Sequence, residues 1–165
     1  MKLTTFNSKL ATVLAVALAN SLVAMSQVPI HYQIKDLGVV GASPGQPFQI
    51  TNNGLTSGAV VSGGVSRATL WYQRFKLSIG HGLGGVNSIA FGANDRLQAV
   101  GEAETSTPDS NHEDFCGFRA SGLTASGTCL PFIWWGDGLV ALPTLGGSNG
   151  VANQIQQLRP GGGDC

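Results

Sequence analysis

Short apolar runs separated by small polar residues follow one another along the chain after residue 27. The runs at residues 87–91 and 97–101 are bounded by Gly, Asn, Asp and Ser, which is the pattern of strands and turns. Residues 70–77 are rich in aromatic side chains and partly alternating, which also predicts a strand. No stretch after residue 27 carries a sustained helical stripe. The pattern therefore predicts an all-β protein.

Two polar clusters mark the turns between these runs. Asn52, Asn53 and Gly54 suit a hairpin, because Asn and Gly tolerate positive φ at low cost. Asn94 and Asp95 separate the runs at 87–91 and 97–101 in the same way. Each cluster predicts a tight reversal between two antiparallel strands.

The chain also carries a degenerate repeat, which occurs three times. Its glycine landmarks Gly41, Gly84 and Gly146 are separated by 43 and 62 residues. Residues 68–71 match residues 131–134 at an offset of 63. The turn segments at residues 50–54, 93–97 and 155–158 are separated by the same two offsets, 43 and 62 residues. Self-similarity of this length is typical of proteins built from repeated structural units.

The natural period is near 43 residues, and the longer second interval predicts an inserted loop at residues 103–129. The predicted organisation is a β-repeat domain at 27–158, with units near 30–66, 67–130 and 131–158, and an irregular tail at 159–165. Several short strands in about 40–50 residues fit one blade of a propeller. The predicted fold is therefore a set of propeller-like repeats of short antiparallel strands.

The number of units is small for such a fold, because the chain holds about 2.5–3 of them and propellers close with about four to eight blades. Either several chains assemble, or the β-structure closes differently, or the chain is truncated. Pro160 and the glycines after it do not continue a strand, which favours truncation.

Several segments resemble the HAF-repeat family, a group of probable extracellular repeat proteins of bacteria. Residues 32–38 resemble the opening of the family's repeat, residues 92–101 its turn and return strand, and residues 131–134 with 142–147 the next unit. Leu97 departs from the pattern, because the family usually has Gly there, and residues 67–71 lack its His and Phe. The resemblance implies an exported protein and supplies no catalytic residues.

Residues 1–26 have the layout of a secretory signal peptide: Lys2 and Lys9 precede an apolar run at 10–25, and small residues follow at the end of it. The run is short for a membrane anchor, which needs about 20 mostly apolar residues. We therefore expect export to the periplasm or the extracellular space, with no membrane attachment after cleavage.

Export changes the interpretation of the three cysteines. Cys116 and Cys129 bracket a Gly- and Ser-rich loop, and in an oxidising compartment such a pair is expected to close as a disulfide. Cys165 is then left as a free thiol or an intermolecular bridge. The spacing does not match a zinc site, and no metal or cofactor is expected.

Charged residues indicate no nucleic-acid partner, because nine basic and nine acidic residues balance and form no basic stripe. The densest polar cluster, residues 109–114, lacks the spacing of a calcium loop and is interpreted as a solvated insertion. The glycine-rich segment 80–85 lacks the Lys-Ser/Thr of a phosphate-binding loop. His31, His81 and His112 stand apart from any nucleophile motif, so no catalytic residue is assigned.

Three tryptophans remain as candidates for contacts. Trp71 and Trp134 occupy the same position in the repeat, which predicts that both are core residues. Trp134 and Trp135 are adjacent on a strand and so face opposite sides. Trp135 is therefore the candidate for contact with a ligand.

The sequence favours a secreted, non-catalytic binding module whose partner is a protein or a polysaccharide, with self-association through open β edges as a further expectation. The alternatives are an extracellular glycan-active enzyme on a propeller-like scaffold, for which Asp95, His112 and Glu113 are the residues to test, and a truncated fragment without independent function.

Overall fold

The computed structural model describes residues 31–34, 36–37 and 45–157. The predicted signal peptide, the tail at 159–165 and Cys165 lie outside the described residues. The chain divides into two units, Met1–Asp36 and Leu37–Cys165. The described part of the first unit, residues 31–34 and 36, contains neither helix nor strand.

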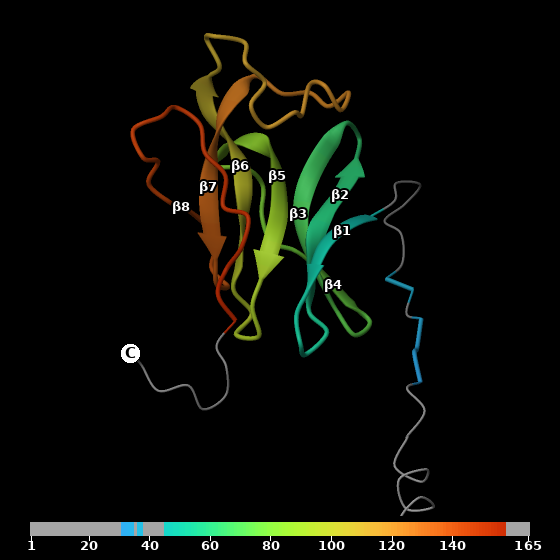
Figure 1. Ribbon diagram of the computed structural model, residues 1–165. Coiled ribbons are helices and arrows are strands. Elements are labelled where there is room, and N and C mark those ends of the chain that lie inside the picture. Colours follow the sequence, from blue (N-terminus) through green and yellow to red (C-terminus); the bar gives the residue numbers. More distant parts are fainter. Residues whose placement is uncertain (1–30, 35, 38–44, 158–165) are drawn as a thin grey trace, which may run out of the picture. The chain divides into compact units, whose positions relative to one another are not determined.

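The described part of the second unit is all-β, as predicted, and consists of two antiparallel sheets of four strands each (Figure 1). The first sheet contains β1 (Gly45–Ile50), β2 (Thr56–Ser62), β3 (Val65–Tyr72) and β4 (Phe75–Ser78). The second contains β5 (Gly84–Ala93), β6 (Ala99–Pro108), β7 (Gly127–Trp134) and β8 (Leu139–Ala141). Consecutive strands pair throughout each sheet. No helix capable of crossing a membrane occurs in the described ranges.

Both predicted turns are confirmed. The first joins β1 to β2, where the N–H of Gly54 donates to the carbonyl of Thr51 at 3.0 Å. The second joins β5 to β6, where the N–H of Leu97 donates to the carbonyl of Asn94 at 3.2 Å. The strand expected at 70–77 is instead a hairpin, because Gln73 adopts a φ of 53° and reverses the chain between β3 and β4.

The first two strands of each sheet pair in an equivalent register. In the first sheet the register shifts between Pro47 and Gln49, and in the second it shifts between Ala90 and Gly92, at the same offset of 43 residues. The side chains inside these two bulges, Phe48 and Phe91, meet edge to face with ring centroids 5.0 Å apart. The bulge therefore places equivalent residues of the two sheets against each other.

Equivalent glycines follow the bulges. A Cβ on Gly58 in β2 would lie 2.2 Å from the carbonyl oxygen of Gln46, and a Cβ on Gly101 in β6 would lie 1.8 Å from that of Ile89. At these positions β2 lies too close to β1, and β6 too close to β5, for the residue to carry a side chain. The repeat at an offset of 43 is thus a repeat of backbone geometry as well as of residue type.

The strand pairings also define equivalent faces of the two sheets. We call the face that holds Thr69 and Trp71 in the first sheet, and Phe132 and Trp134 in the second, the front face; the opposite one is the back face. Trp71 pairs with Thr56, and Trp134 pairs with Ala99, again 43 residues further on. Both indoles are buried, with 2% and 8% of their surface exposed. This confirms the prediction that they are core residues.

The core lies between the back face of the first sheet and the front face of the second. It joins Ala68 and Leu70 of β3 to Phe132 and Trp134 of β7 in one cluster. The remaining buried members of the cluster are Leu55, Ile79, Ala90, Ala93, Ala99 and Ala103. The sheets therefore stack front to back and in the same sense, so each presents a different face to its neighbour.

The segment after β8 runs back along the second sheet without forming a strand (Figure 1). Its N–H groups at Leu142, Gly150 and Ala152 donate to the carbonyls of Pro131, Cys129 and Gly101. Further on, the side-chain carbonyl of Gln157 accepts from the N–H of Asp95 at 3.1 Å. Asp95 in turn accepts from the N–H of Asn53 at 3.2 Å. The three equivalent turn segments of the repeat are therefore linked.

The connection between β6 and β7 contains the largest difference between the two sheets. In the first sheet the corresponding strands are joined by Gly63 and Gly64 alone, whereas in the second they are joined by residues 109–126. This loop is shorter than the predicted insertion at 103–129, because both ends of that range belong to β6 and β7. The predicted unit boundary at residues 66 and 67 falls within β3, so the repeat units of the sequence are not the same segments as the sheets.

Candidate functional site

Trp135, the predicted ligand contact, is 57% exposed and directly follows the last residue of β7. Its equivalent in the first sheet, 63 residues earlier, is Tyr72. Tyr72 lines a small apolar hollow between the sheets together with Leu55, Leu70 and Trp134. Both aromatic residues at this position are therefore exposed, Tyr72 at 37% beside the hollow and Trp135 at 57%.

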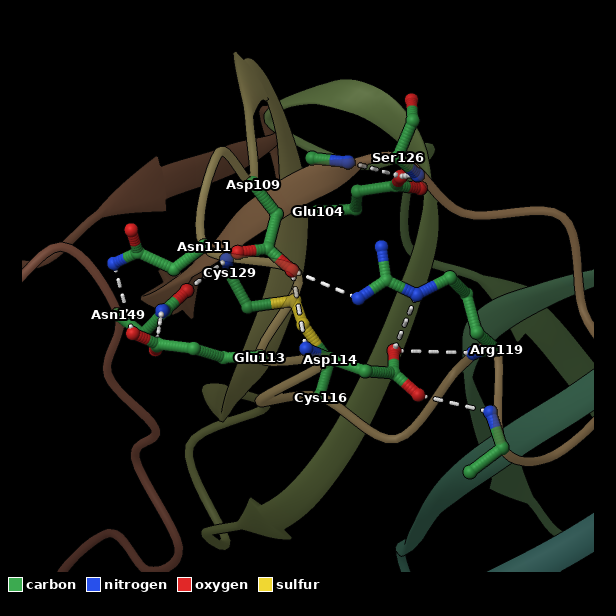
Figure 2. Close-up of polar contacts among 12 residues, drawn as sticks. Glu104, Asp109, Asn111, Glu113, Asp114, Cys116, Arg119, Ser126, Cys129 and Asn149 are labelled. Atoms are coloured by element: carbon green, nitrogen blue, oxygen red, sulfur yellow. Dashed lines mark hydrogen bonds and ion pairs between the residues drawn. A yellow bond between two sulfur atoms is a disulfide. The ribbon is translucent and has the colours of Figure 1, made fainter.

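The polar cluster at 109–114 is held together by its own loop, as Figure 2 shows. The carboxylate of Asp109 accepts from the N–H of Asp114 at 3.0 Å and pairs with the Arg119 guanidinium at 2.9 Å. The carboxylate of Asp114 accepts from the N–H groups of Arg119 and Ala120. The N–H of Asp114 lowers the pKa of the Asp109 carboxyl below its usual value; burial opposes this, and Arg119 reinforces it. These oxygens organise the loop.

A disulfide joins Cys116 in this loop to Cys129 in β7 (Figure 2). The Cα atoms are 6.1 Å apart, within the usual range for such a bond. The bond anchors the loop to the second sheet, and Phe118 beside it is 2% exposed. The cysteine pair expected from the sequence is therefore bonded, which fits an oxidising compartment.

The residues to test for catalysis do not converge. Asp95 lies in the turn before β6, and His112 with Glu113 lies in the loop after it. β6 spans ten residues, or roughly 30 Å at the usual rise of a strand. Glu113 accepts from the side-chain amides of Asn111 and Asn149 at 3.0 and 3.2 Å. These three side chains cannot act on one substrate atom.

The other described histidines lie apart from one another. His31 is exposed in the first unit. The His81 ring, between β4 and β5, contacts the guanidinium of Arg67. No group of three or more His, Cys, Asp or Glu side chains suited to a metal ion occurs in the parts of the chain that the structure describes.

Glu104 in β6 is a buried carboxylate that holds several segments together. Its Oε2 accepts from the N–H groups of Val86 and Asn87 and from the Asn87 side chain, at 3.2, 3.2 and 2.7 Å. Its Oε1 accepts from the N–H groups of Ser126 and Gly127 at 2.8 and 3.0 Å (Figure 2). Burial raises the pKa of Glu104, but these donors together bring it below the usual value. The position of the carboxylate between them indicates a structural role.

Glu102, two residues earlier, is a different kind of buried acid. It is 5% exposed, and burial raises its pKa to about 7. No hydrogen bond to its carboxylate occurs among the described residues. The equivalent residue in the first sheet is Ala59, which is also buried. The second sheet thus carries an isolated acid at a position that is apolar in the first.

The front face of the first sheet contains an open hollow of about 220 Å³. Its lining comes from β2, β3 and β4 and consists of Val60, Ser62, Arg67, Thr69, Lys76 and Ser78. Two of these side chains are cationic and three carry hydroxyl groups. The same face holds Trp71, whose buried indole N–H has no hydrogen-bond partner within the described ranges.

The equivalent positions in the second sheet are mostly apolar. Because Thr69 pairs with Ser78 as Phe132 pairs with Ala141, the two sheets can be compared residue by residue. Arg67, Thr69, Lys76 and Ser78 of the first sheet correspond to Leu130, Phe132, Leu139 and Ala141 of the second. Phe132 is fully buried against the first sheet. At these four positions the second sheet is apolar, whereas the first sheet carries two cations and two hydroxyl groups.

The sequence motifs do not mark this surface, although the repeat contains a signal for it. The match of residues 68–71 with residues 131–134 already aligned Thr69 with Phe132. Extending the alignment by one residue pairs Arg67 with Leu130. Only the pairing of β3 with β4 adds Lys76 and Ser78 to the same face.

No protein-family model matches the chain, and no curated protein or solved structure is detectably similar to it. The resemblance to the HAF-repeat family therefore stays a prediction.

Proposed function

We propose that this chain is an exported, non-catalytic repeat protein that binds a polysaccharide through the front face of its first sheet. In this proposal the two sheets are propeller-like blades, and the HAF-repeat resemblance reflects common ancestry. Front-to-back stacking of equivalent four-stranded sheets supports the first point, because blades of a propeller stack in this sense. The disulfide between Cys116 and Cys129 supports export.

The observation that carries the binding role is the reversed polarity of the front face. A repeat unit normally buries this face against its neighbour, as Phe132 does in the second sheet. In the first sheet this face has an open hollow, whose lining includes Arg67, Lys76 and the buried Thr69. Hydroxyl and cationic donors in a shallow hollow suit the many hydroxyl groups of a polysaccharide.

The exposed Trp135 provides a second candidate contact, because an indole face can stack on a sugar ring. It belongs to the turn between β7 and β8 and is not part of the hollow. A ligand held there would depend on Trp135 and not on Thr69, which makes the two sites separable by mutation.

The test is binding of the oxidised protein to an array of plant, bacterial and fungal polysaccharides, after cooperative unfolding has been established by circular dichroism. Thr69→Phe fills the hollow with the residue found at the equivalent position of the second sheet, and we expect it to abolish binding. Thr107→Phe, at an exposed position of β6, is the matched control and should leave binding unchanged.

Three results would contradict the proposal. Binding that survives Thr69→Phe but is lost in Trp135→Ala would place the ligand at the second contact. Turnover of a bound polysaccharide would favour the enzyme alternative. Unfolding without cooperativity would favour a fragment without independent function.

A further inference from the structure

We infer that the polysaccharide is anionic and that Arg67 and Lys76 bind its acidic groups in the front-face hollow. This inference rests on the proposed function and adds the chemical class of the ligand. Three features support it: the charges around the hollow, the absence of a carboxylate partner for either cation among the described residues, and a second hollow that meets the first at Ser78.

The charge distribution along the chain is strongly uneven. No Asp or Glu occurs between Asp36 and Asp95, so the first sheet contains no acidic residue at all. Its charged residues are Arg67, Arg74 and Lys76. The second sheet and its loops are rich in acids instead: Asp95, Glu102, Glu104, Asp109, Glu113, Asp114 and Asp137 against Arg96 and Arg119. The balanced net charge of the chain conceals this contrast.

The two cations of the hollow are available for a ligand. Neither cation pairs with a carboxylate of the described residues, unlike Arg119, which pairs with Asp109 and Asp114. Arg67 instead contacts the His81 ring, which fixes the guanidinium at the rim of the hollow. A guanidinium pairs with a carboxylate, sulfate or phosphate through two parallel hydrogen bonds, and an ammonium adds a point charge.

Two hydroxyl groups of the lining add uncharged contacts for a sugar. Ser62 and Ser78, on β2 and β4, are both exposed. Thr69 is buried, and its hydroxyl donates to the carbonyl of Arg67 at 2.9 Å, so it is not offered to the ligand. Uncharged donors and acceptors placed between two cations match a sugar ring that carries both hydroxyl and acidic groups.

A second hollow lies beside the edge strand β4, next to the β7–β8 turn. It has a volume of about 350 Å³ and shares Ser78 with the first. His81 lines the second hollow and contacts Arg67 of the first. Asp137 lies at its rim and would repel an anionic group there. The two hollows therefore meet at Ser78 on the edge strand β4, and the acidic groups of a ligand are expected at the Arg67 side.

A solvated cap is the competing explanation, because the terminal unit of a repeat array needs a polar outer face. A cap has no need for charges of one sign, and a mixture of Lys and Glu would serve solubility equally well. Nucleic acid is the competing polyanion. The hollow has no exposed aromatic side chain on which bases would stack, and such stacking is the usual basis of single-strand binding.

The experiment compares polygalacturonate with its fully methyl-esterified form, using alginate and a sulfated galactan as further anionic probes, by biolayer interferometry at low and high salt. We expect the anionic polymers to bind, the methyl ester to bind roughly tenfold or more weakly, and affinity to fall with salt. Arg67→Gln/Lys76→Gln should weaken binding of the anionic polymers by a similar factor. Arg74→Gln/Arg96→Gln removes the same charge outside the hollow and should have little effect.

The outcomes separate this inference from the proposed function. Equal binding of ester and acid, lost in Thr69→Phe but not in Arg67→Gln/Lys76→Gln, would overturn the anionic ligand and keep the polysaccharide-binding role. Equal losses in both double variants would show that net charge matters and the hollow does not, which overturns the inference. Tighter binding of a single-stranded oligonucleotide, or no binding of any polysaccharide by the folded protein, would overturn both.

Discussion

The two sheets of this protein share one backbone geometry and differ in the chemistry of their surfaces and loops. Both have a bulge in the first strand, a glycine at the close approach in the second and a buried tryptophan in the third. The first sheet has a two-glycine connection and a cationic front face; the second has a disulfide-anchored loop and an apolar front face. The comparison teaches that backbone geometry can be repeated while surface chemistry is reversed.

The largest expected effect tests the shared plan. Trp71→Ala and Trp134→Ala should each lower the free energy of unfolding by about 3–5 kcal/mol, because each removes a buried aromatic side chain from an equivalent place. Urea denaturation measures both. Trp135→Ala, at an exposed position, is the control and should cost well under 1 kcal/mol. A small loss at Trp71 would mean that the front face of the first sheet is not packed around it.

The next effect tests the loop that only the second sheet has. Reducing the disulfide, or changing Cys116 and Cys129 together to Ser, should lower the free energy of unfolding by about 3 kcal/mol. The reason is that the bond closes a loop between residues that are 13 positions apart in the sequence. Thermal melts with and without reductant provide the measurement. Cys165→Ser removes the odd thiol and should leave the oxidised melt unchanged. An unchanged melt for the double variant would show that Asp109 and Arg119 suffice to hold the loop.

A comparable effect at high pH concerns the isolated acid of the second sheet. Burial raises the pKa of Glu102 from 4.5 to about 7 in the folded state. The protonated form is therefore favoured on folding, and its contribution is fully present below pH 4.5 and is lost as the pH rises through 7. Glu102→Gln should be more stable than the parent by about 3 kcal/mol at pH 8 and similar to it at pH 4.

Denaturation curves across this range measure the effect, with Glu113→Gln as an exposed control. A pH dependence that persists unchanged in Glu102→Gln would assign it to another group. Glu102→Ala, which copies Ala59 of the first sheet, separates the charge from the side-chain volume.

The smallest effect concerns the equivalent turns. Gly54 and Leu97 occupy the same position and both have positive φ, 85° and 62°. Only glycine adopts this region without strain, at a difference of about 1 kcal/mol. Leu97→Gly should therefore stabilise the protein slightly, and Gly54→Ala should destabilise it by a similar amount, as measured by thermal melting. Opposite signs would mean that the Leu97 side chain contributes packing that outweighs its backbone strain.

Much of the local structure could be predicted from residue types. Asn and Gly predicted both turns, the position of Trp71 and Trp134 in the repeat predicted their burial, and the spacing of Cys116 and Cys129 predicted the bond between them. The reversal at Gln73 was missed, because a non-glycine residue with positive φ carries no clear mark in the sequence. The candidate site was missed for a related reason: its residues come from three strands whose register no local pattern specifies.

The sequence by itself therefore determined the class of the fold, its period and the elements that depend on neighbouring residues, since turn propensity and alternation act over a few positions. The tertiary structure decided which faces are buried. Phe132 and Thr69 are equivalent in the repeat and both are buried, but only Phe132 belongs to the core cluster between the sheets. Thr69 belongs to the lining of an open hollow. That distinction depends on which sheet stands next to which, because burial of a face requires a neighbour to cover it.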